Sequence, residues 1–138
     1  MKNLFLLAGF FFFGAGVSMA QKYYTKSGTI AFDATSPSSP ERVEGMNRSA
    51  TCVVDTKSGA MQFAVLMKGF AFERARMEEH FNENYVESHK FPKAEFKGKS
   101  KDPENIDYAK DGTYSVKVKG DLTMHGETKE VETTGKLV

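Results

Sequence analysis

The segment 114-YSVKVKGDLTM-124 alternates apolar and polar residues over its whole length. Its even positions carry tyrosine, valine, valine, glycine, leucine and methionine, while every odd position carries a charged or hydroxyl side chain. Successive side chains of a β-strand point to opposite faces, so this period of two predicts a strand with one apolar and one polar face. The segment is the clearest secondary-structure element in the sequence.

The same alternation recurs in shorter segments at 61–68, 94–97 and 130–137, and briefly around Ile30 and Phe32. Residues 51–55 form a further predicted strand, and the turn sequence DTKSG at 55–59 connects it to the next strand. The sequence HGE at 125–127 joins the last two strands in the same way. Turns this short connect antiparallel neighbours, so the sequence predicts an antiparallel meander.

Residues 72–88 have helical rather than strand periodicity. Met77, Phe81 and Tyr85 recur at every fourth position, with arginines and glutamates between them. We expect one amphipathic helical excursion that ends before Pro92, because proline disfavours a helical conformation in the preceding residue.

The apolar strand faces need a partner, and a single helix supplies too little apolar surface to cover all of them. Closing the sheet on itself turns these faces inward and removes the exposed edges. A barrel of ~8 strands can fill its interior with side chains or keep room for one small ligand. We therefore predict a mainly β fold, an antiparallel β-barrel with one helical excursion.

Residues 1–20 have the features of a cleaved secretory signal. Lys2 supplies a positive charge, residues 4–13 are almost entirely apolar, and Ser18-Met19-Ala20 places small residues at the two positions that a signal peptidase reads. This predicts an exported protein with one domain over residues 21–138. A membrane anchor is the alternative, but the apolar run is short for a bilayer span, so we do not expect an integral membrane protein.

Charge and cysteine content narrow the expected partners. The 19 basic residues include Lys2, and its removal leaves 18 basic residues against 18 acidic ones. This balance gives no support for a nucleic-acid partner. Cys52 is the only cysteine, so no intrachain disulfide can form. It lies in phase with Ala50 and Val54, which predicts a buried structural thiol, with an intermolecular bridge and a homodimer as the alternative.

The sequence contains no recognisable catalytic constellation. A nucleophile elbow, a phosphate-binding loop and a His-Glu-x-x-His motif are absent, and His80, His89 and His125 lack metal-ligand spacing. We therefore predict no catalytic residue, no metal, no cofactor and no enzymatic activity. The pair Glu78-Glu79 is interpreted as solvated helix surface, and His125 as a turn residue.

Two parts of the sequence resemble the hallmarks of the YceI family. The first is 77-MEEHFNENY-85 followed by 90-KFPKAEFKG-98, and the second is 120-GDLTMHGETK-129. Their order and spacing also fit, and the resemblance covers nearly all of residues 21–138. It implies a lipocalin-like, extended antiparallel barrel that binds an amphipathic isoprenoid-type lipid in its interior, in a periplasmic or secreted bacterial protein. Relatives continue with further strands, so the resemblance also implies a barrel left incomplete at the C-terminus.

The resemblance changes how the apolar residues are interpreted. Alternation alone favours a filled core, although the flexible thioether of methionine suits either gap-filling or a variable ligand. The resemblance implies instead that they line a lipid cavity, with His80 as a structural histidine or a contact to the lipid head group. The predicted lipid-binding residues are Phe63, Val65, Met67, Met77, Phe81, Phe96, Val116, Val118, Leu122 and Met124. The predicted function is binding, transport or storage of a small hydrophobic ligand. The alternative is a non-enzymatic structural or protein-interaction domain with a filled core.

Overall fold

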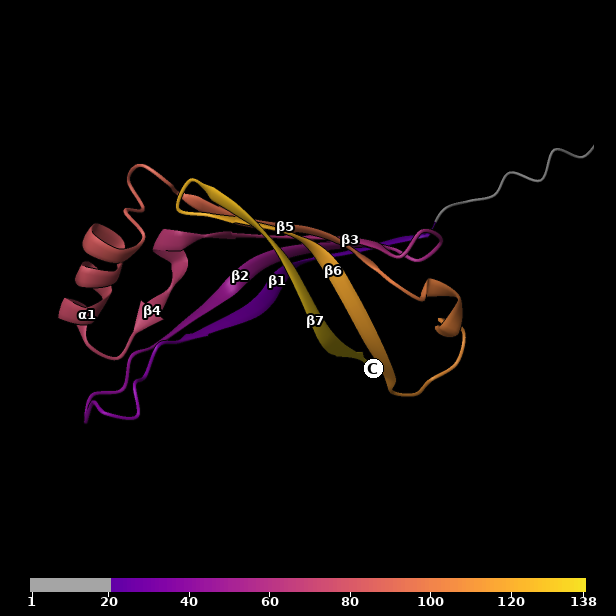
Figure 1. Ribbon diagram of the computed structural model, residues 1–138, viewed down its shortest axis with the longest axis horizontal. Coiled ribbons are helices and arrows are strands. Elements are labelled where there is room, and N and C mark those ends of the chain that lie inside the picture. Colours follow the sequence, from indigo (N-terminus) through magenta and orange to yellow (C-terminus); the bar gives the residue numbers. More distant parts are fainter. Residues whose placement is uncertain (1–20) are drawn as a thin grey trace, which may run out of the picture.

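The computed structural model describes residues 21–138, so the predicted signal at 1–20 lies outside the described residues. The described chain forms one seven-stranded sheet with a short helical segment at one end (Figure 1). The strands are β1 (Lys22–Asp33), β2 (Glu44–Asp55), β3 (Ala60–Leu66), β4 (Ala71–Phe72), β5 (Lys93–Ser100), β6 (Tyr114–Met124) and β7 (Glu127–Leu137). The helical elements are η1 (Met67–Gly69), α1 (Ala75–His80), η2 (Phe81–Tyr85) and η3 (Pro103–Asn105). We call α1 and η2 together the helical segment.

The six long strands follow the order β1-β2-β3-β5-β6-β7, and each pair of neighbours is antiparallel. The short strand β4 lies off this path and pairs with the beginning of β2. The predicted mainly β fold with an antiparallel meander and one helical excursion is therefore confirmed.

Both predicted turns are present, and their side chains explain them. In the β2–β3 turn, the Asp55 carboxylate accepts the backbone N–H groups of Lys57 (2.9 Å) and Ser58 (3.2 Å), and Gly59 takes a positive φ of 72°. In the β6–β7 hairpin, His125 and Gly126 take φ values of 53° and 73°. A two-residue hairpin turn with two left-handed residues matches the natural twist of the strands that it joins.

We call the face of the sheet that carries the even-numbered residues of β6 the inner face. Cross-strand pairing places Leu122 beside Phe96, Phe96 beside Phe63, and Phe63 beside Cys52. The Phe63 and Phe96 ring centroids lie 6.0 Å apart. The alternation in four separate strands therefore produces one continuous apolar row across the sheet.

The helical segment covers one end of this inner face and buries the core there. Phe81 is only 4% exposed, and its ring centroid lies 5.2 Å from that of Phe32, 5.6 Å from Phe70 and 4.8 Å from Phe72. Tilted and edge-on aromatic pairs at these distances stabilise beyond the burial of their area. The buried cluster comprises Ala50, Val65, Met67, Phe70, Phe81, Val86 and Ala94.

The helical segment differs from the single predicted helix over 72–88. It is a six-residue α-helix continued by a π-helical turn, in which the Val86 N–H donates to the Phe81 carbonyl five residues back (3.0 Å). Five-residue spacing puts Val86 (7% exposed) into the buried row after Phe81 and leaves Tyr85 73% exposed. The prediction that Tyr85 continues the buried stripe is therefore wrong.

Glu78 also departs from its predicted place on the solvated surface. It is half-buried, and its carboxylate accepts the backbone N–H of Phe72 (3.2 Å). Its neighbour Glu79 is exposed, as expected. Glu78 thus satisfies a backbone donor of β4, which a sequence pattern alone does not reveal.

The sheet of the described residues is open rather than closed into a barrel. Its order ends at β1 on one side and β7 on the other, and these two strands do not pair with each other. Six long strands are fewer than the ~8 around which a ligand-sized barrel closes, which explains why this sheet stays open. Closure therefore remains a prediction, and the sheet has two open edges, β1 and β7.

Candidate functional site

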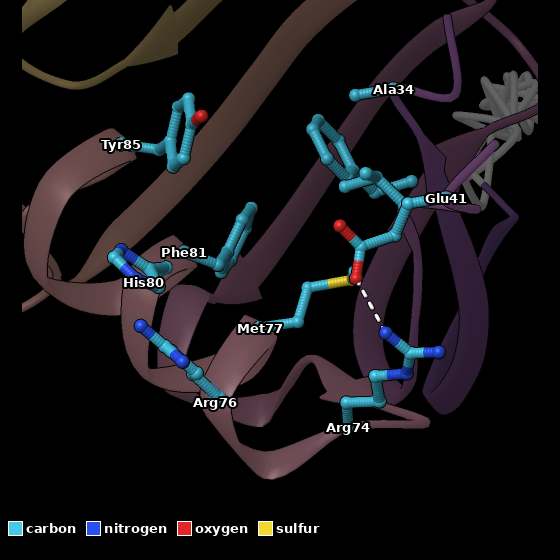
Figure 2. Close-up of a pocket in the computed structure, with 10 residues that line it drawn as sticks. Ala34, Glu41, Arg74, Arg76, Met77, His80, Phe81 and Tyr85 are labelled. Atoms are coloured by element: carbon cyan, nitrogen blue, oxygen red, sulfur yellow. Dashed lines mark hydrogen bonds and ion pairs between the residues drawn. The ribbon is translucent and has the colours of Figure 1, made fainter. Parts of the chain in front are cut away.

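A cavity of about 600 Å³ lies between the helical segment and the end of β1 (Figure 2). This volume falls within the usual range for small-molecule sites, ~300–1,000 Å³. Its apolar lining consists of Phe32, Ala34, Val43, Met77 and Phe81. These side chains come from the end of β1, the loop before β2, and two successive turns of the helical segment. Packing of the helical segment against the end of β1 therefore brings together lining residues that lie far apart in the sequence.

The absence of a side chain at Gly45 shapes the end of the sheet beside this cavity. Gly45 pairs with Phe32 on one side and with Phe72 on the other. A Cβ at Gly45 would lie only 2.6 Å from the Phe72 ring, so the ring occupies the space that a side chain would take. Phe72 is thereby placed against Phe81, whose ring forms part of the cavity wall.

The rim of the cavity is polar and is formed by Glu41, Arg74, Arg76, His80 and Tyr85. Glu41 and Arg74 form an ion pair (2.7 Å) across the mouth, drawn as a dashed line in Figure 2. Both side chains are largely exposed, so the pair contributes little to folding stability. It does connect the loop before β2 with the start of α1.

His80 occupies the rim with a defined orientation. Nδ1 of His80 lies 2.8 Å from the side-chain amide nitrogen of Asn84, a hydrogen bond in which the role of His80 is set by its tautomer. This bond engages Nδ1 and leaves the Nε2 edge of the ring, opposite Asn84, for a further partner.

The middle of the inner face, beyond the helical segment, is only partly covered. Phe63, Phe96 and Leu122 are each half-buried, and Cys52 lies in the same row. Partial burial raises the pKa of the Cys52 thiol above its ordinary value. The thiol is thus not the fully buried residue that the sequence predicted, and it lies on the inner face of the sheet.

The predicted lipid-binding residues fall into three groups. Met77 and Phe81 line the cavity, and the predicted head-group residue His80 lies at its rim. Val65 and Met67 belong to the buried core beneath the helical segment. The strand residues away from the cavity all lie on the inner face, from buried Val116 and Val118 to exposed Met124, and comprise Phe63, Phe96, Val116, Val118, Leu122 and Met124.

The sequence did not indicate several residues that line the cavity. Alternation identifies Phe32 only as a strand residue, and helical spacing predicts that Arg76 lies on the polar helix surface, whereas both line the cavity. One usable signal was present: Arg76 and His80 are four residues apart, a spacing that places two side chains on the same face of a helix.

A hydrogen bond between His125 and Glu87 attaches the β6–β7 hairpin to the segment that follows η2. Nε2 of His125 lies 2.8 Å from Glu87, and the Lys90 ammonium lies 2.6 Å from the same carboxylate. The His125 ring also meets the Phe91 ring edge-on, with centroids 4.9 Å apart. Hydrogen bonds from Lys90 first, and then from His125, lower the pKa of Glu87 from its ordinary value of 4.5 to about 2. His125 is therefore more than a turn residue, since it contacts Glu87 and Phe91 in the segment that follows η2.

We expect Glu87→Gln to destabilise the protein near neutral pH, with the loss shrinking in acid. A carboxylate whose pKa is lowered in the folded state stabilises above its unfolded pKa, here near 4.5, and loses that contribution as the pH falls toward 2. Urea unfolding of both proteins between about pH 7 and pH 3 measures this, and Glu79→Gln is the matched control on the exposed helix surface. A constant difference between wild type and E87Q at all pH values would contradict the ion-pair interpretation.

Residues 21–138 contain no helix that is both long and apolar enough to span a membrane. In the same residues, no three or more histidine, cysteine, aspartate or glutamate side chains are grouped so as to hold a metal ion. The arrangement offers an apolar surface with a polar rim, which is suited to holding an amphiphile.

Comparisons with known proteins identify the family and the fold. A family model described as the YceI-like domain matches residues 14–138. The chain is similar to a polyisoprenoid-binding domain from Saccharophagus degradans implicated in plant cell wall breakdown, with a TM-score of 0.69 and 11% identity, covering 85% of this chain and 67% of that one. It is also similar to the Campylobacter jejuni YceI protein, with a TM-score of 0.46 and 17% identity, covering 97% of this chain and 67% of that one. No match was found among the curated proteins.

Proposed function

Because this chain belongs to the YceI-like family, we propose that it binds an amphipathic isoprenoid-type lipid and carries or stores it in the bacterial cell envelope. The observation that carries the proposal is the apolar cavity of about 600 Å³, together with the half-buried aromatic and aliphatic side chains of the inner face. The polyisoprenoid-binding domain with the same fold supports the choice of ligand class.

Burial of the hydrocarbon tail supplies enough free energy without any special chemistry. Each methylene removed from water gains ~0.8 kcal/mol, so ~10 buried carbons gain roughly 8 kcal/mol before the cost of association. Phe32, Met77 and Phe81 provide such a surface at the helical end, and Phe63 and Phe96 extend it along the sheet. We propose binding alone, without catalysis, as the activity of this surface.

The proposed location is the periplasm or the extracellular space. It rests on the sequence of residues 1–20, in which Lys2, an apolar run and Ser18-Met19-Ala20 follow one another. An exported carrier would meet lipids in an environment where a hydrophobic ligand needs a protein partner to move through water.

Native mass spectrometry of the protein, purified without detergent from a bacterial periplasm, tests the proposal. We expect a polypeptide that begins at Gln21 and carries a hydrophobic adduct of discrete mass, which solvent extraction releases. A bare polypeptide mass that persists after incubation with isoprenoid lipids would contradict lipid binding. Association of two copies through the open edges of β1 or β7 is the alternative use of this sheet, and a mass of twice the polypeptide would favour it.

A further inference from the structure

The cavity beneath the helical segment combines an apolar interior with an uneven distribution of charge at its rim. Among the described residues that line it, Glu41 carries the one carboxylate, whereas Arg74 and Arg76 each carry a guanidinium. The glutamates of the helical segment itself do not line the cavity. The rim therefore has an excess of positive charge, although the whole chain is nearly neutral.

The ion pair between Glu41 and Arg74 leaves Arg76 as the uncompensated charge. Glu41 and Arg74 are 2.7 Å apart and neutralise each other. Arg76 has no carboxylate within ion-pair distance among residues 21–138. Its guanidinium extends toward the His80 ring in Figure 2. An arginine that is free of protein partners has its planar fork of donors available for an incoming group.

His80 adds a second nitrogen group at the same place. Its hydrogen bond with Asn84 engages Nδ1 and leaves Nε2, which donates when it carries a proton, for another partner. Arg76 and His80 lie four residues apart, a spacing at which two basic groups do not help a helix and, when both are charged, destabilise it. A shared anionic partner would remove that disadvantage, because it would accept hydrogen bonds from both.

We propose that this cavity holds the anionic head group of the lipid, a phosphate or a carboxylate, between Arg76 and His80. This inference rests on the proposed function and specifies its ligand class. The tail then lies against Phe32, Met77 and Phe81, while the guanidinium of Arg76 donates to two oxygens of the head group. The site discriminates between charged and neutral amphiphiles that have the same tail.

Binding of farnesyl phosphate and farnesol, which share one tail, tests the head-group site. We expect wild-type protein to bind farnesyl phosphate about tenfold more tightly than farnesol, a difference typical of a charge-assisted hydrogen-bonded pair at a partly exposed site. Arg76→Gln should remove most of this preference, because it weakens binding of farnesyl phosphate far more than binding of farnesol. The control Arg48→Gln removes the same charge from an exposed position of β2 that does not line the cavity, and it should keep the preference.

The possible outcomes separate the head-group site from the proposed function. Equal affinity of wild-type protein for the two ligands, or a preference that survives in R76Q, would overturn the head-group site while lipid binding stands. Failure of both ligands to bind would overturn the proposed function itself. Inorganic phosphate separates the two sources of the anion: if wild-type protein binds it as tightly as farnesyl phosphate, the site takes a free anion and the lipid head-group site is overturned. Isothermal titration with each ligand gives these affinities, and circular dichroism confirms that the variants are folded.

Discussion

Substitution of Gly120 by alanine is expected to destabilise the protein by about 3 kcal/mol, the upper end of the usual cost of overpacking. Gly120 of β6 pairs with Gly98 of β5 on the inner face. A Cβ at Gly120 would lie 2.3 Å from the Gly98 Cα and 2.3 Å from the Lys97 carbonyl oxygen. These are backbone atoms held in the sheet, so neither can move aside as the end of a flexible side chain could. The two strands would have to separate at this point.

The neighbouring strand offers a matched control. Gly135 of β7 also lies within a strand, yet a Cβ built there would meet no atom within 4 Å. Gly135→Ala should therefore change the free energy of unfolding by no more than ~0.5 kcal/mol. Urea unfolding followed by far-ultraviolet circular dichroism measures both variants, since the chain has no tryptophan. Equal stability of G120A and G135A would contradict the close approach of β5 and β6.

The strands and turns could be predicted because their signals are local. Alternation at 114–124 reflects one covered and one exposed face, and the turns at Asp55 and at His125-Gly126 use side-chain caps and left-handed residues that the sequence displays directly. The apolar inner face follows from the same alternation, which is why the predicted strand residues share one side of the sheet.

The parts that could not be predicted depend on contacts between distant segments. The π turn that buries Val86 instead of Tyr85 is set by packing against the core, not by residue spacing alone. Asn47, which is fully buried, donates to the Leu66 carbonyl (3.0 Å) and accepts from the Ser49 N–H (2.8 Å), and nothing in its local sequence indicates burial.

The cavity was predicted only in part for the same reason. Met77, Phe81 and His80 lie on one helical segment, so helical spacing could group them. Phe32 at the end of β1 and Glu41 in the following loop also line the cavity. Whether they do so depends on the position at which the helical segment packs on the sheet. The open edges of β1 and β7 likewise depend on how many strands pair in the sheet. Alternation within each strand does not indicate that number.

Cys52 offers a reporter for where the lipid lies. It lies on the inner face between Phe63 of β3 and Thr25 of β1. About seven residues of β1 separate Thr25 from Phe32 at the cavity, which corresponds to roughly 20 Å at the rise of a β-strand. A lipid of that length, with its head at the cavity and its tail along the inner face, would cover the thiol. Geranylgeraniol has a tail of this order.

The rate at which a small maleimide modifies Cys52, with and without geranylgeraniol, is the most direct test of lipid binding on the inner face. If the bound lipid covers the thiol, the rate falls in proportion to the unliganded fraction, about 30-fold at a ligand concentration 30 times Kd. Thr51→Cys in a Cys52→Ser background is the control, because the adjacent residue points to the opposite face and should react at an unchanged rate. An unchanged rate at Cys52 while the lipid is bound, or equal protection at both positions, would contradict a lipid held on the inner face.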